Sequence, residues 1–326
     1  MIGEDYHKVF SVGSRDFEAV ALQIFRRQAA DNPVYKAYLQ ALDIQPSSVN
    51  TVDKIPFLPV SFFKTHEVKT GEFEPQAIFE SSGTTGSVNS RHFIKDLSLY
   101  EKGFTRGFEL NYGPVTDWCI IGLLPSYLER KNSSLVNMVD RLIQLSEHPQ
   151  SGFYLDEYEK LTGVLQELEK RKQSTLLIGV TFALLDLAER FPVSLRNTIV
   201  METGGMKGRR EEMIRAEVHA ILKKLFGVPV IHSEYGMTEL LSQAYSKENG
   251  IFYCPPWMRV MIRDEEDPLQ VKSSGSGAIN IIDLANIHSC SFIATDDVGK
   301  LNADGNFEVL GRLDGSDLRG CSLMIV

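Results

Sequence analysis

Six small residues in the first third of the chain combine hydroxyl groups with glycines. They are Ser81, Ser82, Gly83, Thr84, Thr85 and Gly86. Glycine allows backbone N–H groups to approach an anion closely, and the hydroxyls add further donors, so the run suits a polyphosphate. It is not a Walker A loop, because no Gly-Lys-Ser/Thr follows it. Taken alone, a run of this composition also fits an ordinary flexible loop.

A second polar segment, Tyr235-Gly236-Met237-Thr238-Glu239, follows an apolar stretch that predicts a buried strand over Val228–His232. In open α/β sheets, ligands bind at the carboxyl ends of the strands. There Tyr235 could stack on a base, and the carboxylate of Glu239 could bind Mg²⁺. The alternative interpretation is a strand end followed by a helix cap.

Two further segments place acidic and basic residues near the end of the chain. Asp296 and Asp297 follow Thr295, and paired aspartates at a strand end can accept both hydroxyls of a ribose. The alternative is an Asx turn that opens a hairpin at Asp304-Gly305. Arg312, which follows Gly311, could meet a phosphate or a ribose. Its alternative role is a surface ion pair.

The apolar pattern predicts the elements that would position these segments. Two helices are expected within residues 14–43, with Asn32 as the N-cap of the second and Pro33 as its first residue. Ile55–Phe63 is apolar and contains prolines, so it is expected to be extended. The elements expected next are the strands Ala77–Glu80, Trp118–Leu124, Thr175–Val180 and Thr198–Met201 and the helices Glu157–Lys170, Phe182–Arg190 and Glu211–Phe226.

Alternation of strands and helices predicts an α/β fold with a parallel sheet. After about residue 250 the pattern changes to short strands separated by turn residues, which predicts a small, mostly antiparallel β region. At 326 residues the chain is long enough for one large domain or two.

Composition excludes some classes of function. Apolar residues make up 43% of the chain, and the net charge of −9 argues against a nucleic-acid-binding protein, which would present a basic face. The most apolar stretch, Leu176–Ala188, is too short to span a bilayer and contains Asp186, so no transmembrane segment is expected. The N-terminus has no signal-peptide pattern, and the four cysteines form no CxxC pair, which fits a reducing cytoplasm.

In this order, the four polar segments resemble the signature series of the adenylate-forming superfamily, which includes acyl-CoA synthetases, firefly luciferase and adenylation domains. The resemblance covers roughly residues 76–320 and implies ATP and Mg²⁺ as cofactors. One departure is Arg91-His92, which stands after the hydroxyl-rich run where many members have Pro-Lys. Apart from this departure the resemblance holds, and it implies the family's α/β fold for this chain.

The resemblance also implies roles for individual residues. The hydroxyl-rich run would hold the phosphates of ATP, and Gly204-Gly205 would form the glycine turn against adenine. Asp297, more than Asp296, aligns with the ribose-binding aspartate of the family. The implied nucleotide-binding residues are Ser81, Ser82, Gly83, Thr84, Thr85, Gly86, Gly204, Gly205, Tyr235, Gly236, Thr238, Asp297 and Arg312, with Glu239 as the catalytic and metal-binding carboxylate.

A narrower resemblance connects the chain to the LuxE-type acyl-protein synthetases of bacterial bioluminescence. It rests on Ile55–Phe63 and on Arg319-Gly320-Cys321-Ser322-Leu323 at the C-terminus. Only 12 residues follow Asp314, so the small lid domain that carries a catalytic lysine in the wider family is expected to be absent. In LuxE-type proteins the acyl group passes from AMP to a cysteine near the C-terminus, and Cys321 matches that position.

The domain organisation implied by these resemblances has three parts. Residues 1–75 would form a helical N-terminal region packed on the main domain. Residues 76–313 would form the α/β domain that binds ATP and forms the acyl-adenylate, with its β-rich part from about residue 250. Residues 314–326 would form a short tail that carries the candidate acyl-accepting Cys321.

The resemblance implies a cytoplasmic ligase, an ATP-dependent acyl-protein synthetase. It would activate a carboxylic acid, and most simply a fatty acid, as acyl-AMP and then hold the acyl group on Cys321 as a thioester. An acyl-CoA or acyl reductase or an acyl carrier protein would be the partner that receives it. Two alternatives stay open: an acyl- or aryl-CoA ligase without the lid domain, and a relic that binds nucleotide or acyl ligand without turnover.

Overall fold

Helices and strands alternate through the middle of the chain, and strands predominate after residue 250, as the apolar pattern predicts. The computed structural model describes residues 6–81, 88–124, 132–155, 157–204, 213–264 and 266–313. These residues fall into two units. Unit 1 contains the chain up to Gly107, Gly236–Gln243 and the described residues from Tyr253 onward. Unit 2 contains Phe108–Tyr235 and Ala244–Phe252.

Unit 1 consists mainly of antiparallel strands. They are β1 (Leu58–Pro59), β2 (Ala77–Glu80), β3 (Arg91–Ile94), β11 (Met258–Arg263), β12 (Val271–Lys272), β13 (Gly275–Asp283), β14 (Phe292–Leu301) and β15 (Phe307–Arg312). Within the unit the order is β12-β11-β13-β14-β15, and β1 pairs in parallel with β14. Strands β2 and β3 form a separate hairpin. Gly305 turns the chain between β14 and β15 with a φ of +86°, as the Asp-Gly signal predicts.

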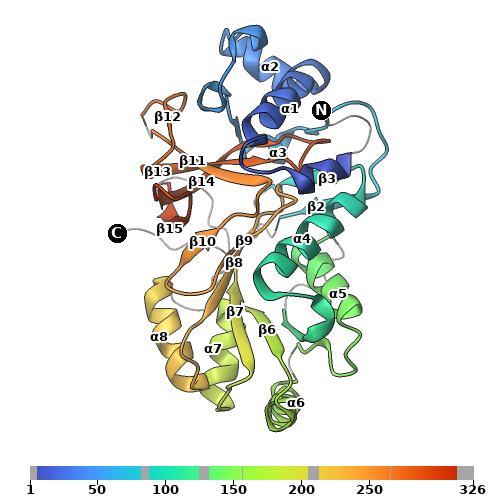
Figure 1. Cartoon of the computed structure of the whole chain (residues 1–326), viewed down its shortest axis with the longest axis vertical. Coiled ribbons are helices and arrows are strands. Elements are labelled where there is room, and N and C mark those ends of the chain that lie inside the picture. Colours follow the sequence, from blue (N-terminus) through green and yellow to red (C-terminus); the bar gives the residue numbers. More distant parts are fainter. Residues whose placement is uncertain are drawn as a thin grey trace. The chain divides into compact units, whose positions relative to one another are not determined.

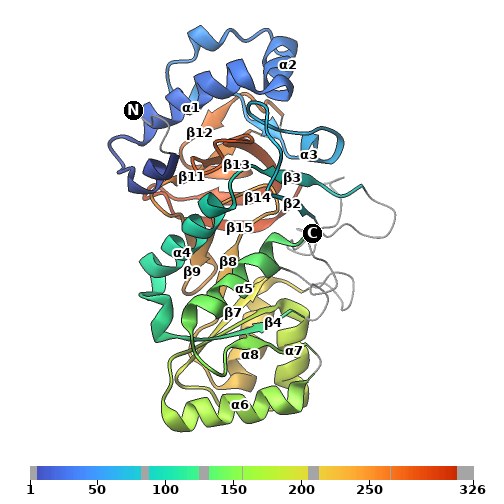
Figure 2. The ribbon, with the colours of Figure 1, turned by 90° about the vertical axis from the view of Figure 1, so that its right-hand side faces the viewer.

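Helices from the beginning of the chain belong to unit 1, and aromatic side chains of two of them pack on Phe292, the first residue of β14. They are α1 (Phe17–Asp31), α2 (Pro33–Ala41) and α3 (Phe62–Thr65), with short 3₁₀ helices at Tyr6–Ser11, Pro46–Ser48 and Val52–Lys54. The ring of Phe292 lies 6.1 Å from Phe25 and 6.3 Å from Tyr35 and Phe57. Aromatic contacts of this kind bury large apolar areas. Figures 1 and 2 both show α1 and α2 beside the strands of unit 1.

Asn32 joins α1, α2 and the interior of unit 1. Its side-chain oxygen accepts a hydrogen bond of 3.0 Å from the N–H of Tyr35, which makes it the N-cap of α2, with Pro33 as the first helical residue. This confirms the predicted helix start. Its amide nitrogen donates to the carbonyl oxygen of Ser289, at 3.0 Å, and to Thr70 Oγ1, at 3.3 Å. A helix cap therefore also satisfies buried polar atoms far away in the sequence.

Unit 2 consists mainly of a parallel sheet flanked by helices. Its strands are β4 (Cys119–Leu123), β5 (Gly152–Phe153), β6 (Thr175–Val180), β7 (Thr198–Thr203), β8 (His232–Tyr235), β9 (Ala244–Ser246) and β10 (Ile251–Tyr253). Within the unit the order is β10-β9-β8-β7-β6-β4-β5. Strands β4 to β8 pair in parallel, and β9 runs antiparallel to β8. Every residue of β4 and β6 is buried, as expected for parallel strands covered on both faces.

The helices of unit 2 cover this sheet. They are α5 (Ser134–Ser146), α6 (Tyr158–Arg171), α7 (Thr181–Arg190) and α8 (Arg215–Phe226), with a 3₁₀ helix at Val115–Asp117. Helix α5 packs on β4, while α7 contacts α8, β6 and β7 (Figure 1). Helix α4 (Leu97–Tyr112) contributes residues to both units. In the described part of the chain, none of the helices combines the length and the apolar character that crossing a membrane requires.

Three expected elements differ from the structure. The helix expected over Glu211–Phe226 begins only at Arg215. Ile55–Phe63 is extended only in its first part, because α3 begins at Phe62, beyond the last proline that would restrict the backbone. The strand expected at Val228–His232 lies later, at His232–Tyr235. Its position is set by pairing with β7, where Met201 faces His232. The apolar pattern of one segment carries no information about the strand with which it pairs, so it could not predict this position.

Replacement of Asn32 by alanine should destabilise the protein. The change removes the cap of α2 and the hydrogen bond to Ser289, so the free energy of unfolding should fall by about 1–3 kcal/mol. Denaturation by urea measures it. Gln40→Ala, at an exposed position of the same helix, should change it by less than about 0.5 kcal/mol. Equal effects of the two substitutions would contradict the role of Asn32.

Candidate functional site

The hydroxyl-rich run follows β2 and leads into β3 of the same hairpin. Ser81 is its one described residue, and residues 82–86 lie outside the described part of the chain. The N–H of Ser81 donates to the carbonyl oxygen of Ser90, at 3.1 Å, and its hydroxyl accepts from the N–H of Ser90, at 2.9 Å. These two hydrogen bonds join Ser81, which follows β2, to Ser90, which precedes β3.

Gly204 and Tyr235 lie at neighbouring carboxyl ends of two parallel strands. Gly204 follows β7 directly, Tyr235 ends β8, and the strands pair Thr203 with Glu234. Gly204 has a φ of +74°, a conformation that glycine adopts without strain, and its carbonyl accepts from the hydroxyl of Thr181 at 2.9 Å. Parallel strand ends of this kind are where ligands bind in α/β sheets. Gly205 lies outside the described residues.

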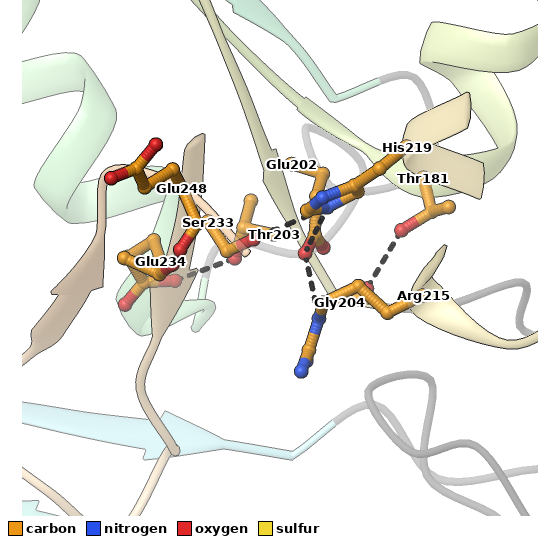
Figure 3. A network of polar contacts seen from close by, with 10 residues as sticks. Thr181, Glu202, Thr203, Gly204, Arg215, His219, Ser233, Glu234 and Glu248 are labelled. Atoms are coloured by element: carbon orange, nitrogen blue, oxygen red, sulfur yellow. Dashed lines mark hydrogen bonds and ion pairs between the residues drawn. The ribbon is translucent and has the colours of Figure 1, made fainter. Parts of the chain in front are cut away.

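A polar network surrounds these strand ends (Figure 3). Glu202 of β7 accepts a hydrogen bond of 3.1 Å from Arg215 Nε, and its carboxylate lies 3.5 Å from His219 Nε2. In the next pair of residues along β7 and β8, Glu234 accepts a hydrogen bond of 2.6 Å from the hydroxyl of Thr203. Successive residues of a strand point to opposite faces, so the two carboxyl groups occupy different surroundings.

The two carboxyl groups have opposite pKa shifts. Burial raises the pKa of Glu234 to about 7, and the charge of Glu202 adds to this, although the Thr203 hydroxyl opposes it. Burial also acts to raise the pKa of Glu202, but the hydrogen bond from His219 and the charges of Arg215 and His219 outweigh it and lower the pKa. Glu202 is therefore an ionised carboxylate at neutral pH, whereas Glu234 is close to half protonated.

The segment that carries Glu239 belongs to unit 1 from Gly236 onward. The Glu239 side chain is completely buried, and Thr238 and Gly236 are half-buried. The carbonyl oxygen of Thr238 lies 2.8 Å from Nδ1 of His92, and the carbonyl oxygen of Glu239 accepts a hydrogen bond of 2.7 Å from the Asn286 amide. These contacts hold the peptide groups on both sides of Glu239.

A single carboxylate at Glu239 is compatible with Mg²⁺. This ion is usually held by one or two carboxylates that act together with substrate phosphates. Among the described residues there is no group of three or more His, Cys, Asp or Glu arranged to hold a metal. One carboxylate at Glu239 is the kind of donor that Mg²⁺ takes when a polyphosphate supplies other ligands.

Asp297 and Arg312 are brought together across β14 and β15. The two residues are direct partners in the antiparallel register. Asp296 and Asp297 thus lie within β14, whereas the sequence predicted a strand end. Arg312 donates to Asp296 at 3.0 Å, and its Nε lies 3.9 Å from a carboxylate oxygen of Asp297. The hydroxyl of Thr295 accepts from the N–H of Asp297 at 3.1 Å. Two residues chosen from separate segments thus form one charged cluster. Cys321 lies outside the described residues.

Sequence reasoning missed four polar residues that the structure places beside these segments. They are His92, Glu202, Glu234 and Asn286. A signal existed for Glu202, an acidic residue in the mostly apolar strand that ends just before Gly204, and for Glu234, an acidic residue directly before Tyr235. For His92 and Asn286 the sequence offers no comparable signal, since their partners are 146 and 47 positions away.

Comparison with known families gives one match over nearly the whole chain. A family model described as "Acyl-protein synthetase, LuxE" matches residues 11–326. Among curated proteins, the long-chain-fatty-acid–luciferin-component ligase of Aliivibrio fischeri is 25% identical over 304 residues. That alignment covers 85% of this chain and 79% of the relative.

Solved structures of adenylate-forming enzymes share the fold. ATP-bound MatB from Rhodopseudomonas palustris superposes with a TM-score of 0.57 and 16% identity, covering 76% of this chain and 49% of MatB. This chain thus spans about half the length of MatB. A 2-hydroxyisobutyryl-CoA ligase in complex with 2-HIB-AMP and CoA gives a TM-score of 0.67 and 13% identity, covering 94% of this chain and 69% of the ligase. The predicted fold class is therefore confirmed.

The opposite shifts at Glu202 and Glu234 predict opposite effects of pH. A raised pKa in the folded state means that Glu234 favours folding while protonated and loses this advantage as pH rises from about 4.5 through 7. Glu234→Gln should therefore stabilise the protein relative to wild type at pH 8 more than at pH 5, by on the order of 1 kcal/mol for this half-buried group.

Glu202→Gln is the matched control for that measurement. The lowered pKa of Glu202 means that its charge stabilises the folded state above its unfolded pKa, so the substitution should destabilise the protein at both pH 5 and pH 8. Urea denaturation of the wild type and both variants at the two pH values measures the differences. Parallel pH dependence of the two variants would contradict the assignment.

Proposed function

This chain belongs to the LuxE family of acyl-protein synthetases, and from this premise we propose that it activates a carboxylic acid with ATP and transfers the acyl group to Cys321. As a member of that family it is a ligase. The observation that carries the proposal is the placement of the predicted nucleotide-binding residues. Gly204 and Tyr235 lie at adjoining strand ends, and Asp297 faces Arg312.

The first step would be adenylation. A carboxylate oxygen of the acid attacks the α-phosphorus of ATP, the bond from that phosphorus to the bridging oxygen breaks, and pyrophosphate leaves. Mg²⁺, held by Glu239, would neutralise charge on the phosphates. Asp297 would accept the hydroxyl groups of the ribose, Arg312 would place a positive charge beside this aspartate, and Tyr235 would stack on adenine.

The loop residues complete the proposed nucleotide site. Backbone N–H groups and hydroxyls of Ser81–Gly86 would donate to the phosphates. Gly204 and Gly205 would allow close approach of the backbone to adenine, since Gly204 already has the positive φ that such a turn needs. Gly236 and Thr238 would line the segment between Tyr235 and Glu239.

The second step would load the protein. The thiolate of Cys321 attacks the carbonyl carbon of acyl-AMP, the bond from this carbon to the phosphate oxygen breaks, and AMP leaves with a thioester on the protein. The proton of the thiol goes to solvent or to AMP. A reducing compartment such as the cytoplasm would keep this thiol available.

The other cysteines are poorly suited to this step. Burial raises the pKa of the Cys119 thiol to about 11 and those of Cys254 and Cys290 to about 12. Cys119 and Cys290 are buried, and Cys254 is half-buried. Because the thiolate is the nucleophile, a thiol with such a pKa reacts slowly at neutral pH. These properties support Cys321 as the acceptor.

A long-chain fatty acid is the first substrate to test, because the curated relative is named for one. The acceptor would be a protein that takes up or reduces the acyl group, such as an acyl carrier protein or a reductase.

Covalent labelling tests the proposed acceptor. With ATP, Mg²⁺ and radiolabelled fatty acid, the wild-type protein should become labelled, and neutral hydroxylamine should release the label as it does from thioesters. Cys321→Ser should lose this label and keep ATP–pyrophosphate exchange. Cys290→Ser is the matched control and should still be labelled.

Each other outcome has a defined meaning. A hydroxylamine-labile label that persists in Cys321→Ser would refute the role of this cysteine. Release of AMP that depends on free CoA would favour a CoA ligase. A wild-type chain that exchanges no pyrophosphate with any of a panel of acids would favour a protein that binds ligand without turnover.

Replacement of Asp297 tests the ribose assignment. Asp297→Ala should raise the dissociation constant for ATP at least about tenfold, because hydrogen bonds to a charged group are lost. Asp296→Ala is the control, since it removes the shorter ion pair with Arg312 and leaves the predicted ribose ligand in place. Isothermal titration with ATP measures both. Unchanged affinity in a folded Asp297→Ala protein would contradict the assignment.

A further inference from the structure

The connection between β13 and β14 runs through the interior of unit 1. Residues 283–291 are all buried, with 7% exposure at most. A buried connection must find partners for its polar backbone groups within the protein. Gln28 donates to the carbonyl oxygen of Asn286 at 3.1 Å, and the Thr70 hydroxyl donates to that of Ser289 at 2.6 Å. Contacts with the first part of the chain thus hold this connection in place.

One end of the connection holds the segment that follows Glu239. A carboxylate oxygen of Asp283 accepts hydrogen bonds from the N–H groups of Leu241, at 2.8 Å, and Ser242, at 3.0 Å. The other oxygen accepts from the Ser242 hydroxyl at 2.7 Å and from the N–H of Ala285 at 3.1 Å. Burial raises the pKa of Asp283, although these donors oppose that effect. One buried carboxyl group therefore ties the Glu239 segment to the connection.

Asn286 and His92 hold the segment from its other side. The Asn286 amide nitrogen donates to the carbonyl oxygen of Glu239 at 2.7 Å, and its amide oxygen lies 3.0 Å from Nε2 of His92. Nδ1 of the same imidazole lies 2.8 Å from the carbonyl oxygen of Thr238. Asn286 and His92 are each 1% exposed. Two adjacent carbonyl groups are thus fixed by two buried side chains that also contact one another.

The surroundings of His92 leave little space for a ligand. A cavity of about 10 Å³, lined by His92, Asn286 and His288 among others, lies beside the cluster. This volume accommodates roughly one water molecule. The polar contacts described for His92 and Asn286 are with the backbone of Thr238 and Glu239 and with one another, so a role for these side chains acts through that backbone.

We propose that His92, Asp283 and Asn286 are positioning residues that fix the backbone from Thr238 to Ser242 and thereby the direction in which Glu239 presents its carboxylate. The proposal rests on the proposed function, in which Glu239 binds Mg²⁺. His92 belongs to β3, the strand that follows the hydroxyl-rich run. The same imidazole thus ties the hairpin that bears the phosphate loop to the segment that bears the metal ligand.

The substitution Asn286→Ala tests the proposal against a matched control. It removes the hydrogen bond to Glu239 and the contact with His92. Thr70→Val keeps the side-chain volume and removes a hydrogen bond to Ser289, near the other end of the same buried connection. Both substitutions should lower the melting temperature. Asn286→Ala alone should disturb the Glu239 segment.

Hydrogen exchange measures that disturbance without any substrate. In Asn286→Ala, the peptide that covers residues 238–242 should exchange its amide hydrogens about tenfold faster or more, because the protection of this local unit depends on the lost contacts. In Thr70→Val, faster exchange should be confined to residues 286–291. Equal protection of residues 238–242 in the wild type and both variants would overturn the proposal.

The Mg²⁺ requirement of pyrophosphate exchange is the second measurement. Asn286→Ala should need about tenfold more Mg²⁺ for half-maximal exchange at a temperature where it is folded, and Thr70→Val should match the wild type. His92→Asn retains an amide close to the position of Nδ1, so it should need less Mg²⁺ than His92→Leu. Identical Mg²⁺ requirements in Asn286→Ala and Thr70→Val would refute the positioning role.

The two measurements separate this proposal from the proposed function. A wild-type protein without pyrophosphate exchange contradicts the proposed function, and the hydrogen-exchange comparison then decides whether the three residues hold the Glu239 segment. Wild-type exchange activity with unaltered behaviour of Asn286→Ala supports the proposed function and refutes the positioning role.

Discussion

The hydrogen bonds to the carboxyl group of Asp283 organise the polar interior of unit 1. This group is completely buried and accepts from the backbone of Leu241, Ser242 and Ala285 and from one hydroxyl. A buried carboxylate without such partners would cost several kcal/mol, so the donors and the acceptor must be assembled together. The course of the chain after Glu239 and the start of the connection to β14 both follow from that requirement.

Buried carboxyl groups also need partners at the strand ends of unit 2. There the partners differ between two neighbouring carboxyl groups and shift their pKa values in opposite directions. Glu202 meets Arg215 and His219, which stabilise its charge, whereas Glu234 meets the hydroxyl of Thr203 and the charge of Glu202, which do not stabilise a second charge to the same degree (Figure 3). Positions that differ by one residue along paired strands therefore differ in protonation. Pairs of carboxyl groups separated in this way are common at functional sites.

Local sequence predicted the elements that depend on local forces. The strand Thr175–Val180 lies where the apolar run places it, because a strand buried on both faces needs a continuous run of such residues. The start of α2 follows from Asn32-Pro33, since the cap and the fixed φ of proline act within one turn. In contrast, β8 lies four residues later than predicted at its start, because pairing with β7 sets its position.

For the candidate site, the sequence by itself determined which residue types could bind a nucleotide and in which order they occur. Family membership rests on the match of the family model to residues 11–326. The tertiary structure alone decided what surrounds them. It placed Arg312 opposite Asp297, and it brought His92 and Asn286, 194 positions apart, to the two carbonyl groups beside Glu239. The physical reason is that a motif consists of residues close together in the sequence, so their types and order can be read from the chain. The partners of a buried polar group are chosen by the packing of distant segments, since any donor or acceptor left unpaired in the interior would oppose folding.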